Sequence, residues 1–153
     1  MLNVEPGQRP ENDAGYLEMM TAVIFMGGLN RQVVMGKWDG FLEAFEQFDV
    51  EAVADFTDVD VERLSNDGRI IRYKAKIRAM VNNAREMVEI AEDHGSFGAW
   101  LQQTVEQEGV APTAKILGDR FKYLSEDSGR LYLYAVGEDV EVSDKERAKY
   151  GAA

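Results

Sequence analysis

The chain has no cysteine, only one histidine (His94) and only 3 prolines among its 153 residues. The lack of cysteine excludes disulfides, thiol catalysis and zinc sites built from cysteine and histidine. A Ser-His-Asp triad would have to use His94, which lies just before Gly95 at a predicted helix end, where a basic group suits the helix dipole. We therefore assign His94 to a helix end or to the exposed surface, and we expect no metal and no cofactor.

Long hydrophobic runs are also missing. The longest, MMTAVIFM at residues 19–26, is shorter than the roughly 20 residues that a membrane-spanning helix needs. The first residues have no basic stretch followed by an apolar one, so no signal peptide is predicted, and we expect a cytoplasmic protein with no membrane partner. From the length and the ordinary composition we expect one domain over residues 1–153, with a helical core at about 13–140 and polar termini.

Apolar residues recur at helical spacing along most of the chain, which predicts an all-α fold. Asn30, either Thr57 or Asp58, and Ser96 are expected to cap helices, and Gly95 to end one. RLYLYAV at residues 130–136 alternates like a strand, but it has no partner hairpin and a helix is favoured. The tail DKERAKYGAA, residues 144–153, is expected to fray. Helices are expected at about residues 13–26, 31–48, 60–66, 75–93 and 97–109, with short ones before residue 57 and within 111–121 and 125–137.

The expected helix at residues 31–48 carries a stripe of large apolar side chains. They follow one another at spacings of four, three, four and three, which places them on one helical face. Such a stripe is typical of core packing rather than of a cofactor site, so we assign these residues to the core. The stripe consists of Val34, Trp38, Phe41, Phe45 and Phe48.

Positive charge is concentrated in one short segment of an acidic chain. The net charge is −11, yet five of the ten residues from 69 to 78 are Lys or Arg. They lie in a tight turn and at the start of the helix that follows it, a helix-hairpin-helix arrangement in which Ile70 and Ile71 anchor the turn. A helix N-terminus with free amides and nearby cations suits the backbone of double-stranded DNA, although a solvated basic turn would show the same pattern. The candidate DNA-binding residues are Arg69, Arg72, Lys74, Lys76 and Arg78.

The stretch from residue 44 to 85 resembles the bacterial DNA-3-methyladenine glycosylase I family, of the helix-hairpin-helix DNA glycosylase superfamily. The family segments AF-x-x-FD, D-V-E-R-L, I-I-R-x-x-x-K-I and N-A-R all occur here at matching spacing. FMGGLN at 25–30 resembles the family's F-Q-A-G-L-S, and FKYL at 121–124 resembles its F-K-F-V. The resemblance covers about residues 16–137. It implies a DNA-glycosylase-like helical bundle of base-excision-repair type that binds DNA.

The resemblance also implies a pocket into which a cationic alkylated adenine is flipped before its glycosidic bond is hydrolysed. The family's pocket glutamate corresponds to Val23 in this chain, and its pocket tryptophan corresponds to Arg31. Valine offers a cation no hydrogen bond and arginine repels it, while Glu18 points about 140° away from Val23 around the same helix. The residues of the sequence do not identify a catalytic group. The base-pocket positions are Val23, Arg31 and Tyr16, and the candidates for stacking are Tyr16, Tyr132 and Tyr134.

The resemblance would further imply a structural zinc site, which family members build from residues near both chain ends. This chain has no cysteine, and Val142 stands at the position of the C-terminal histidine. The resemblance therefore implies that this clamp is dispensable or is replaced by packing or by an oligomeric contact. A homo-oligomer is one of these alternatives.

Three hypotheses about function follow. In the first, the protein binds DNA through the hairpin while excision of 3-methyladenine is lost or altered, which leaves open whether it is an enzyme. In the second, it is a non-enzymatic scaffold or an oligomeric interaction protein. In the third, it is a glycosylase for a different damaged base that Arg31 reads. We favour them in this order.

Overall fold

The computed structural model describes residues 1–152, and within this range all regular structure is helical, as predicted. Residues 130–135, for which a strand was the alternative, belong to a helix. The helices before the basic hairpin are α1 (Asp13–Met26), α2 (Arg31–Met35), α3 (Trp38–Ala44), the 3-10 helix η1 (Glu46–Phe48), α4 (Val50–Ala54) and α5 (Asp58–Leu64). Those after it are α6 (Lys74–His94), α7 (Phe97–Glu108), α8 (Val110–Arg120), α9 (Glu126–Ala135) and α10 (Asp144–Tyr150).

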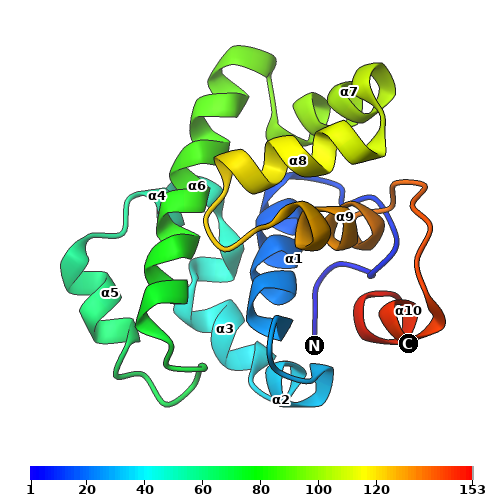
Figure 1. The fold of residues 1–153 in the computed structure, drawn as a ribbon. Coiled ribbons are helices and arrows are strands. Elements are labelled where there is room, and N and C mark those ends of the chain that lie inside the picture. The colour runs from blue at the N-terminus through cyan, green and yellow to red at the C-terminus, as the bar shows by residue number, and fades with distance from the viewer. Residues whose placement is uncertain (153) are drawn as a thin grey trace.

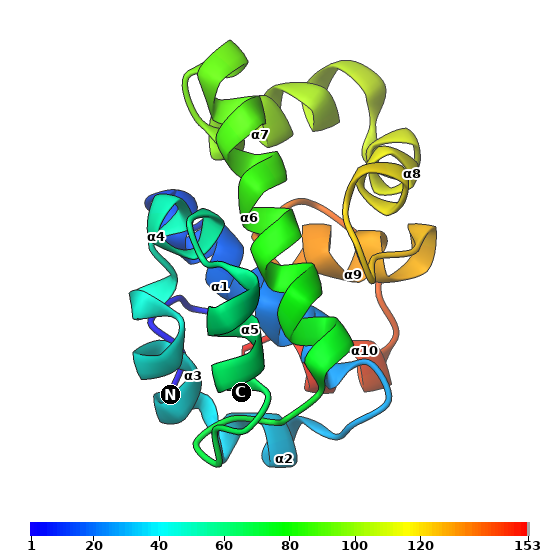
Figure 2. The same ribbon diagram turned by 90° about the vertical axis from the view of Figure 1, so that its left-hand side faces the viewer.

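Helix α1 lies at the centre of the molecule, and the other helices surround it (Figure 1). Every residue from Gly15 to Met26 is buried, because apolar side chains cover all faces of this helix. The longest helix, α6, packs against α1, α4 and α5 and runs the length of the molecule (Figure 2). Helices α8 and α9 pack against each other on the other side of α1. The core thus surrounds one apolar helix.

The prediction of one continuous helix at residues 31–48 was wrong, because the segment is divided into α2, α3 and η1. Helix α2 ends where the amide of Gly36 donates to the carbonyl of Gln32. The segment ends in three consecutive left-handed residues, 46–48, with φ between 53° and 59°. The apolar stripe is nevertheless fully buried as predicted. Its rings stack: Trp38 lies 4.9 Å from Phe41 and 5.5 Å from Phe48 between centroids.

The hairpin at residues 65–73 rests directly on α3. A Cβ added at Gly40 would lie 2.0 Å from the carbonyl oxygen of Arg69, so only glycine allows the two backbones to approach this closely. Lys37 also donates from Nζ to the carbonyl of Gly68 at 2.9 Å. Ile70 is buried, which confirms that it anchors the turn. The hairpin is therefore held in a fixed position beside the C-terminal end of α1.

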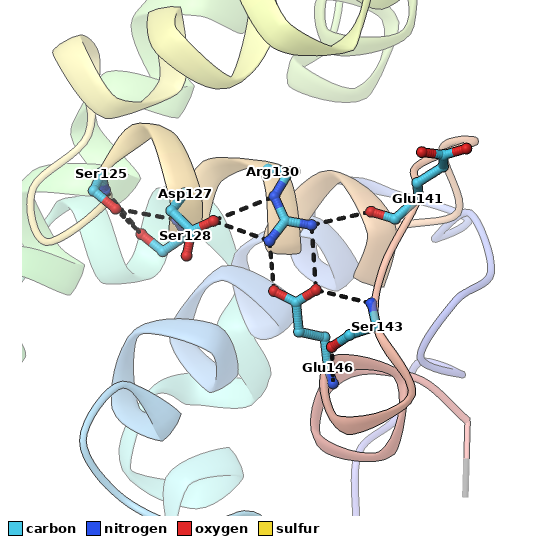
Figure 3. A network of polar contacts seen from close by, with 7 residues as sticks. All are labelled: Ser125, Asp127, Ser128, Arg130, Glu141, Ser143 and Glu146. Carbon is cyan, nitrogen blue, oxygen red and sulfur yellow. Dashed lines mark hydrogen bonds and ion pairs between the residues drawn. The ribbon is translucent and has the colours of Figure 1, made fainter.

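The tail that was expected to fray instead forms α10, and its first turn is held by Arg130 of α9 (Figure 3). The Arg130 guanidinium contacts the side chain of Glu146, the side chain of Asp127 at 2.9 Å and the carbonyl of Glu141 at 3.0 Å. Ser143 and Glu146 form a capping box at the start of the helix. The polar composition of the tail predicted that it would be solvated rather than packed. These contacts instead give its first turn hydrogen-bond and ion-pair partners within the fold.

Candidate functional site

A pocket of about 540 Å³ opens between the C-terminal end of α1, the hairpin and α10. Its volume lies in the range of ligand sites, roughly 300–1,000 Å³. Most of its walls are apolar, and three tyrosines from different segments contribute to it. The residues that characterise it are Val23, Ile71, Tyr73, Lys76, Tyr123 and Tyr150.

Lys76 is the charged residue of this pocket, and it is buried, with 8% of its surface exposed. Its Nζ donates to the carbonyl of Gly27 at 3.0 Å and lies 5.1 Å from the centroid of the Tyr73 ring and 5.7 Å from that of Phe25. Burial, and secondarily the charge of Lys149, lowers the pKa of the Lys76 ammonium. Within residues 1–152, no acidic side chain lines the pocket or pairs with Lys76. Lys76 therefore does not lie on the surface with the other four candidate DNA-binding residues.

Of the three predicted pocket positions, Val23 lines the pocket and presents only an apolar side chain there. Arg31 is directed at the end of α10 instead. Its Nη1 donates to the carbonyl of Gly151 at 2.7 Å and to that of Ala148 at 3.0 Å. A cation that binds the last carbonyls of a helix stabilises its C-terminus. Arg31 thus holds α10, the helix that brings Tyr150 to the pocket.

Tyr16 lies in the core and does not line the pocket. Its ring packs edge-on against Phe97, with centroids 5.6 Å apart, and its hydroxyl accepts a hydrogen bond from Gln102. Tyr132 is also buried, and its hydroxyl donates to the main-chain carbonyl of Tyr16 at 2.8 Å. Tyr134 does not line the pocket either. These tyrosines stabilise the fold around α1.

The pocket tyrosines that sequence reasoning missed are Tyr73, Tyr123 and Tyr150. Tyr73 and Tyr123 are each 48% exposed and meet edge to face, with ring centroids 6.2 Å apart. Tyr150 is buried on α10. Tyr73 ends the predicted hairpin, so its position beside the pocket could have been predicted from the sequence. Tyr123 and Tyr150 reach the pocket from positions 50 or more residues away, which no local pattern reveals.

Two of the predicted hairpin cations are paired with acids. Arg69 contacts Asp67 at 2.7 Å and Glu43 of α3 at 3.0 Å. Lys74 contacts Glu62 of α5. The Lys74 ammonium lowers the pKa of the Glu62 carboxyl, and Arg69 lowers that of Asp67. The acidic neighbours therefore offset part of the positive charge of the hairpin.

Arg72 and Arg78 are exposed and form no ion pair or side-chain hydrogen bond with any residue in the described range 1–152. They flank the start of α6, where no side chain caps the helix. The first amide groups of this 21-residue helix therefore remain free to donate hydrogen bonds to an external acceptor. Free amides at a helix N-terminus between two unpaired cations make an anion-binding surface.

Glu18, five residues before Val23 on α1, serves a different part of the molecule. Its Oε2 accepts hydrogen bonds from the indole of Trp38 at 2.9 Å and from the amide of Asn3 at 2.8 Å. Burial raises the pKa of this carboxyl, although the two N–H donors oppose the effect. Glu18 lines another, more polar hollow under the N-terminal segment. As its spacing predicted, it does not supply the acid that is missing at Val23.

Within residues 1–152, no group of three or more histidine, cysteine or acidic side chains is placed to hold a metal ion. In the same range, no helix has both the length and the apolar character to cross a bilayer.

Comparisons with known proteins agree with the resemblance in residues 44–85. A family model described as methyladenine glycosylase matches residues 4–128. The chain is 32% identical over 111 residues to DNA-3-methyladenine glycosylase 1 of Escherichia coli strain K12, covering 72% of this chain and 59% of that protein. It is 28% identical over 83 residues to DNA-3-methyladenine glycosylase of Haemophilus influenzae, covering 54% of this chain and 45% of that protein. The chain thus spans about half the length of these curated relatives.

Solved structures give the same result for the fold. A crystal structure of 3-methyladenine DNA glycosylase I superposes with a TM-score of 0.77 at 25% identity, covering 87% of this chain and 83% of that one. The corresponding enzyme of Staphylococcus aureus, in a structure on 3-methyladenine recognition, gives a TM-score of 0.79 at 24% identity, with 92% and 85% coverage. The predicted glycosylase-like helical bundle is confirmed.

Proposed function

The chain belongs to the methyladenine glycosylase family, and we propose that it binds double-stranded DNA through the hairpin while excision of 3-methyladenine is lost or altered. The observation that carries this proposal is the position of the hairpin beside a pocket that holds a buried cation and no acid. The hairpin surface suits the DNA backbone, whereas the pocket chemistry does not suit a cationic base.

The DNA-binding part rests on the start of α6. The helix is uncapped, and the unpaired Arg72 and Arg78 flank its free amides. Such a surface binds phosphate oxygens through the helix dipole and through salt-sensitive attraction, without reading sequence. The exposed Tyr73 and Tyr123 stand at the adjoining pocket, where a flipped base would meet them.

The altered excision rests on Val23 and Lys76. The resemblance places a glutamate at residue 23, but valine offers neither charge nor a hydrogen bond to an alkylated adenine. The Lys76 ammonium adds repulsion between like charges in a site of low dielectric. A lost hydrogen bond to a charged group weakens recognition by roughly 1.5–3 kcal/mol. The lysine belongs to the I-I-R-x-x-x-K-I segment that this chain shares with the family, so the change is at residue 23, where valine leaves Lys76 as the charged side chain of the pocket and disfavours a cation.

A DNA-binding titration at several salt concentrations tests the first part. We compare the wild type with the double variant Arg72→Gln/Arg78→Gln, using Lys115→Gln as control because Lys115 lies on α8, at the opposite end of the molecule from the hairpin (Figure 1). Wild-type affinity should fall steeply with salt, and the double variant should reduce the slope of log affinity against log salt by about two. The control should leave this slope unchanged. Absence of binding even at low salt would support the scaffold hypothesis instead.

A base-release assay on alkylated DNA tests the second part. We expect little or no release of 3-methyladenine compared with an active relative under the same conditions. Release at a comparable rate would show that Val23 does not impair the chemistry and would overturn this half of the proposal.

A further inference from the structure

We propose that the pocket binds a flat ring that presents hydrogen-bond acceptors, a neutral or anionic keto-bearing base, with Lys76 as the donor that recognises it. The inference rests on the proposed function and names its substrate class. Tyr73, Tyr123 and Tyr150 surround the ring in this arrangement. The hypothesis of a glycosylase for a different damaged base is thereby modified, because Lys76 rather than Arg31 recognises the base.

The first argument is that the hydrogen-bonding capacity of Lys76 is only partly used. An ammonium group has three N–H donors, and the structure provides Nζ with one acceptor, the carbonyl of Gly27. The side chain is 8% exposed and forms no ion pair within residues 1–152. Burial of a charge without a partner is costly, so an acceptor that enters the pocket gains a strong, charge-assisted hydrogen bond.

The second argument is the sign of the surrounding charge. Lys149 lies close enough to repel the Lys76 ammonium electrostatically. Asp127 and Glu146 act on Tyr150, but both are paired with Arg130 (Figure 3). The charged side chain that lines the pocket is thus a cation, which favours an electron-rich edge over a cationic ligand.

The third argument is that Ser128 and the Nη1 atom of Arg31 are already engaged within the fold. Ser128 lines the pocket, but its hydroxyl accepts from the amide of Ser125 at 2.8 Å in the capping box of α9 (Figure 3). The Arg31 Nη1 atom is held by the carbonyls at the end of α10. Lys76 is left as the charged donor for a ligand, while the three tyrosines provide the aromatic surfaces on which a base stacks.

The test is an NMR titration of the isolated protein with three nucleosides of different charge at neutral pH: neutral inosine, anionic xanthosine and cationic 1-methyladenosine. Shifts should be largest for the amides of Tyr73, Lys76 and Tyr123. We expect inosine and xanthosine to bind about 10- to 100-fold more tightly than 1-methyladenosine, the range for one hydrogen bond to a charged group. Equal or tighter binding of 1-methyladenosine would overturn the inference, as would absence of binding by all three.

Substitutions then locate the effect. Lys76→Met should remove the preference for xanthosine, whereas the matched control Lys74→Met, two residues earlier and exposed, should keep it. Val23→Glu places an acid in the same pocket without removing Lys76, and it should shift the preference toward 1-methyladenosine. If Lys76→Met fails to fold, Lys76→Gln, which removes the charge but keeps a polar side chain, takes its place, while Val23→Glu tests whether the nucleosides bind in this pocket. An unchanged order of affinities in the folded Lys76 variant would refute the role of Lys76.

This titration contains no DNA, so its result is independent of the salt titration. Loss of DNA binding with retained nucleoside preference would overturn the proposed function but not the pocket chemistry. The reverse result would overturn only the pocket chemistry.

Discussion

The hairpin and the pocket beside it hold cations from the same ten-residue segment in opposite ways. On the hairpin, Arg69 and Lys74 are exposed and face acids from α3 and α5. In the pocket, Lys76 is buried and has no acidic partner within residues 1–152. Exposed ion pairs contribute little to stability, commonly 0–1 kcal/mol, whereas an unpaired buried charge is expensive. A local excess of charge in a sequence therefore does not show which cations are available to a ligand.

This comparison assigns different roles within one basic segment. In the proposed function, the unpaired Arg72 and Arg78 and the uncapped start of α6 contact the DNA backbone, and Lys76 contacts a bound ring. Arg69 and Lys74 mainly connect the hairpin to neighbouring helices. Three variants, described from the largest expected effect to the smallest, test this division.

The largest effect is expected from Gly40→Ala. The added Cβ would collide with the Arg69 carbonyl, 2.0 Å away, and force the hairpin away from α3. We expect a loss of about 2–4 kcal/mol in the free energy of unfolding, because backbone atoms on both sides cannot yield as a flexible side chain would. Chemical denaturation measures this loss, and DNA binding should weaken in parallel.

The control for this variant is Gly68→Ala, in the hairpin itself. A Cβ there meets nothing within 4 Å, so the free energy of unfolding should stay within about 0.5 kcal/mol of wild type. Similar losses in both variants would mean that the hairpin is intolerant of alanine in general, and that its contact with α3 is not the cause.

A smaller effect is expected from Arg130→Ala, which removes the contacts that hold the first turn of α10. The loss in stability should be about 0.5–1 kcal/mol, since the ion pairs are partly exposed. Hydrogen exchange should show faster exchange in α10 and, because Tyr150 lies at the pocket, weaker nucleoside binding. Arg63→Ala, which removes an exposed pair on α5, should leave exchange in α10 unchanged.

The same contact predicts a pH dependence. Arg130 lowers the pKa of the Glu146 carboxyl in the folded protein below its ordinary value of 4.5. The stabilisation is therefore complete above pH 4.5 and is lost as the pH falls through the lowered folded-state value. Exchange in α10 should accelerate over that acidic range in the wild type. In Arg130→Ala this acceleration should be reduced, and an identical acid profile in the two proteins would argue against the contact.

The smallest effect is expected from Glu62→Gln, which frees Lys74. We expect DNA affinity to rise about two- to fivefold at low salt and the salt slope to steepen by up to about one, as for one additional phosphate contact. Glu106→Gln on α7, far from the hairpin, changes the net charge equally (Figure 1). If both variants gain the same affinity, the cause is the overall charge and not the release of Lys74.

Local signals in the sequence predicted much of the fold. Asn30, Thr57 and Ser96 cap α2, α5 and α7 as expected, and Gly95 ends α6 with φ 88°. These signals act over three or four residues and need no distant partner. The prediction of a continuous helix at residues 31–48 was wrong, because apolar periodicity indicates which residues are buried but does not detect the turns at Gly36 and at residues 46–48.

The candidate site was less predictable. Val23 lines the pocket at the end of α1, whereas Arg31 binds the carbonyls of α10, a helix that the polar tail did not predict. Tyr150 was missed for the same reason. A capping box at Ser143 and Glu146 was a readable local signal for α10, whereas its anchoring by Arg31 depends on residues more than 100 positions apart.

The sequence by itself determined the all-α class, the family, the buried aromatic stripe and the position of the hairpin, because these depend on periodicity, on caps and on a motif contiguous in the chain. The tertiary structure decided which charges are free. Arg69 meets Glu43 26 residues away in addition to its local partner Asp67, Lys74 meets Glu62 12 residues away, and Lys76 meets its carbonyl 49 residues away. Electrostatic interactions depend on distance and solvation after folding, so the role of each cation was set only when these segments came together.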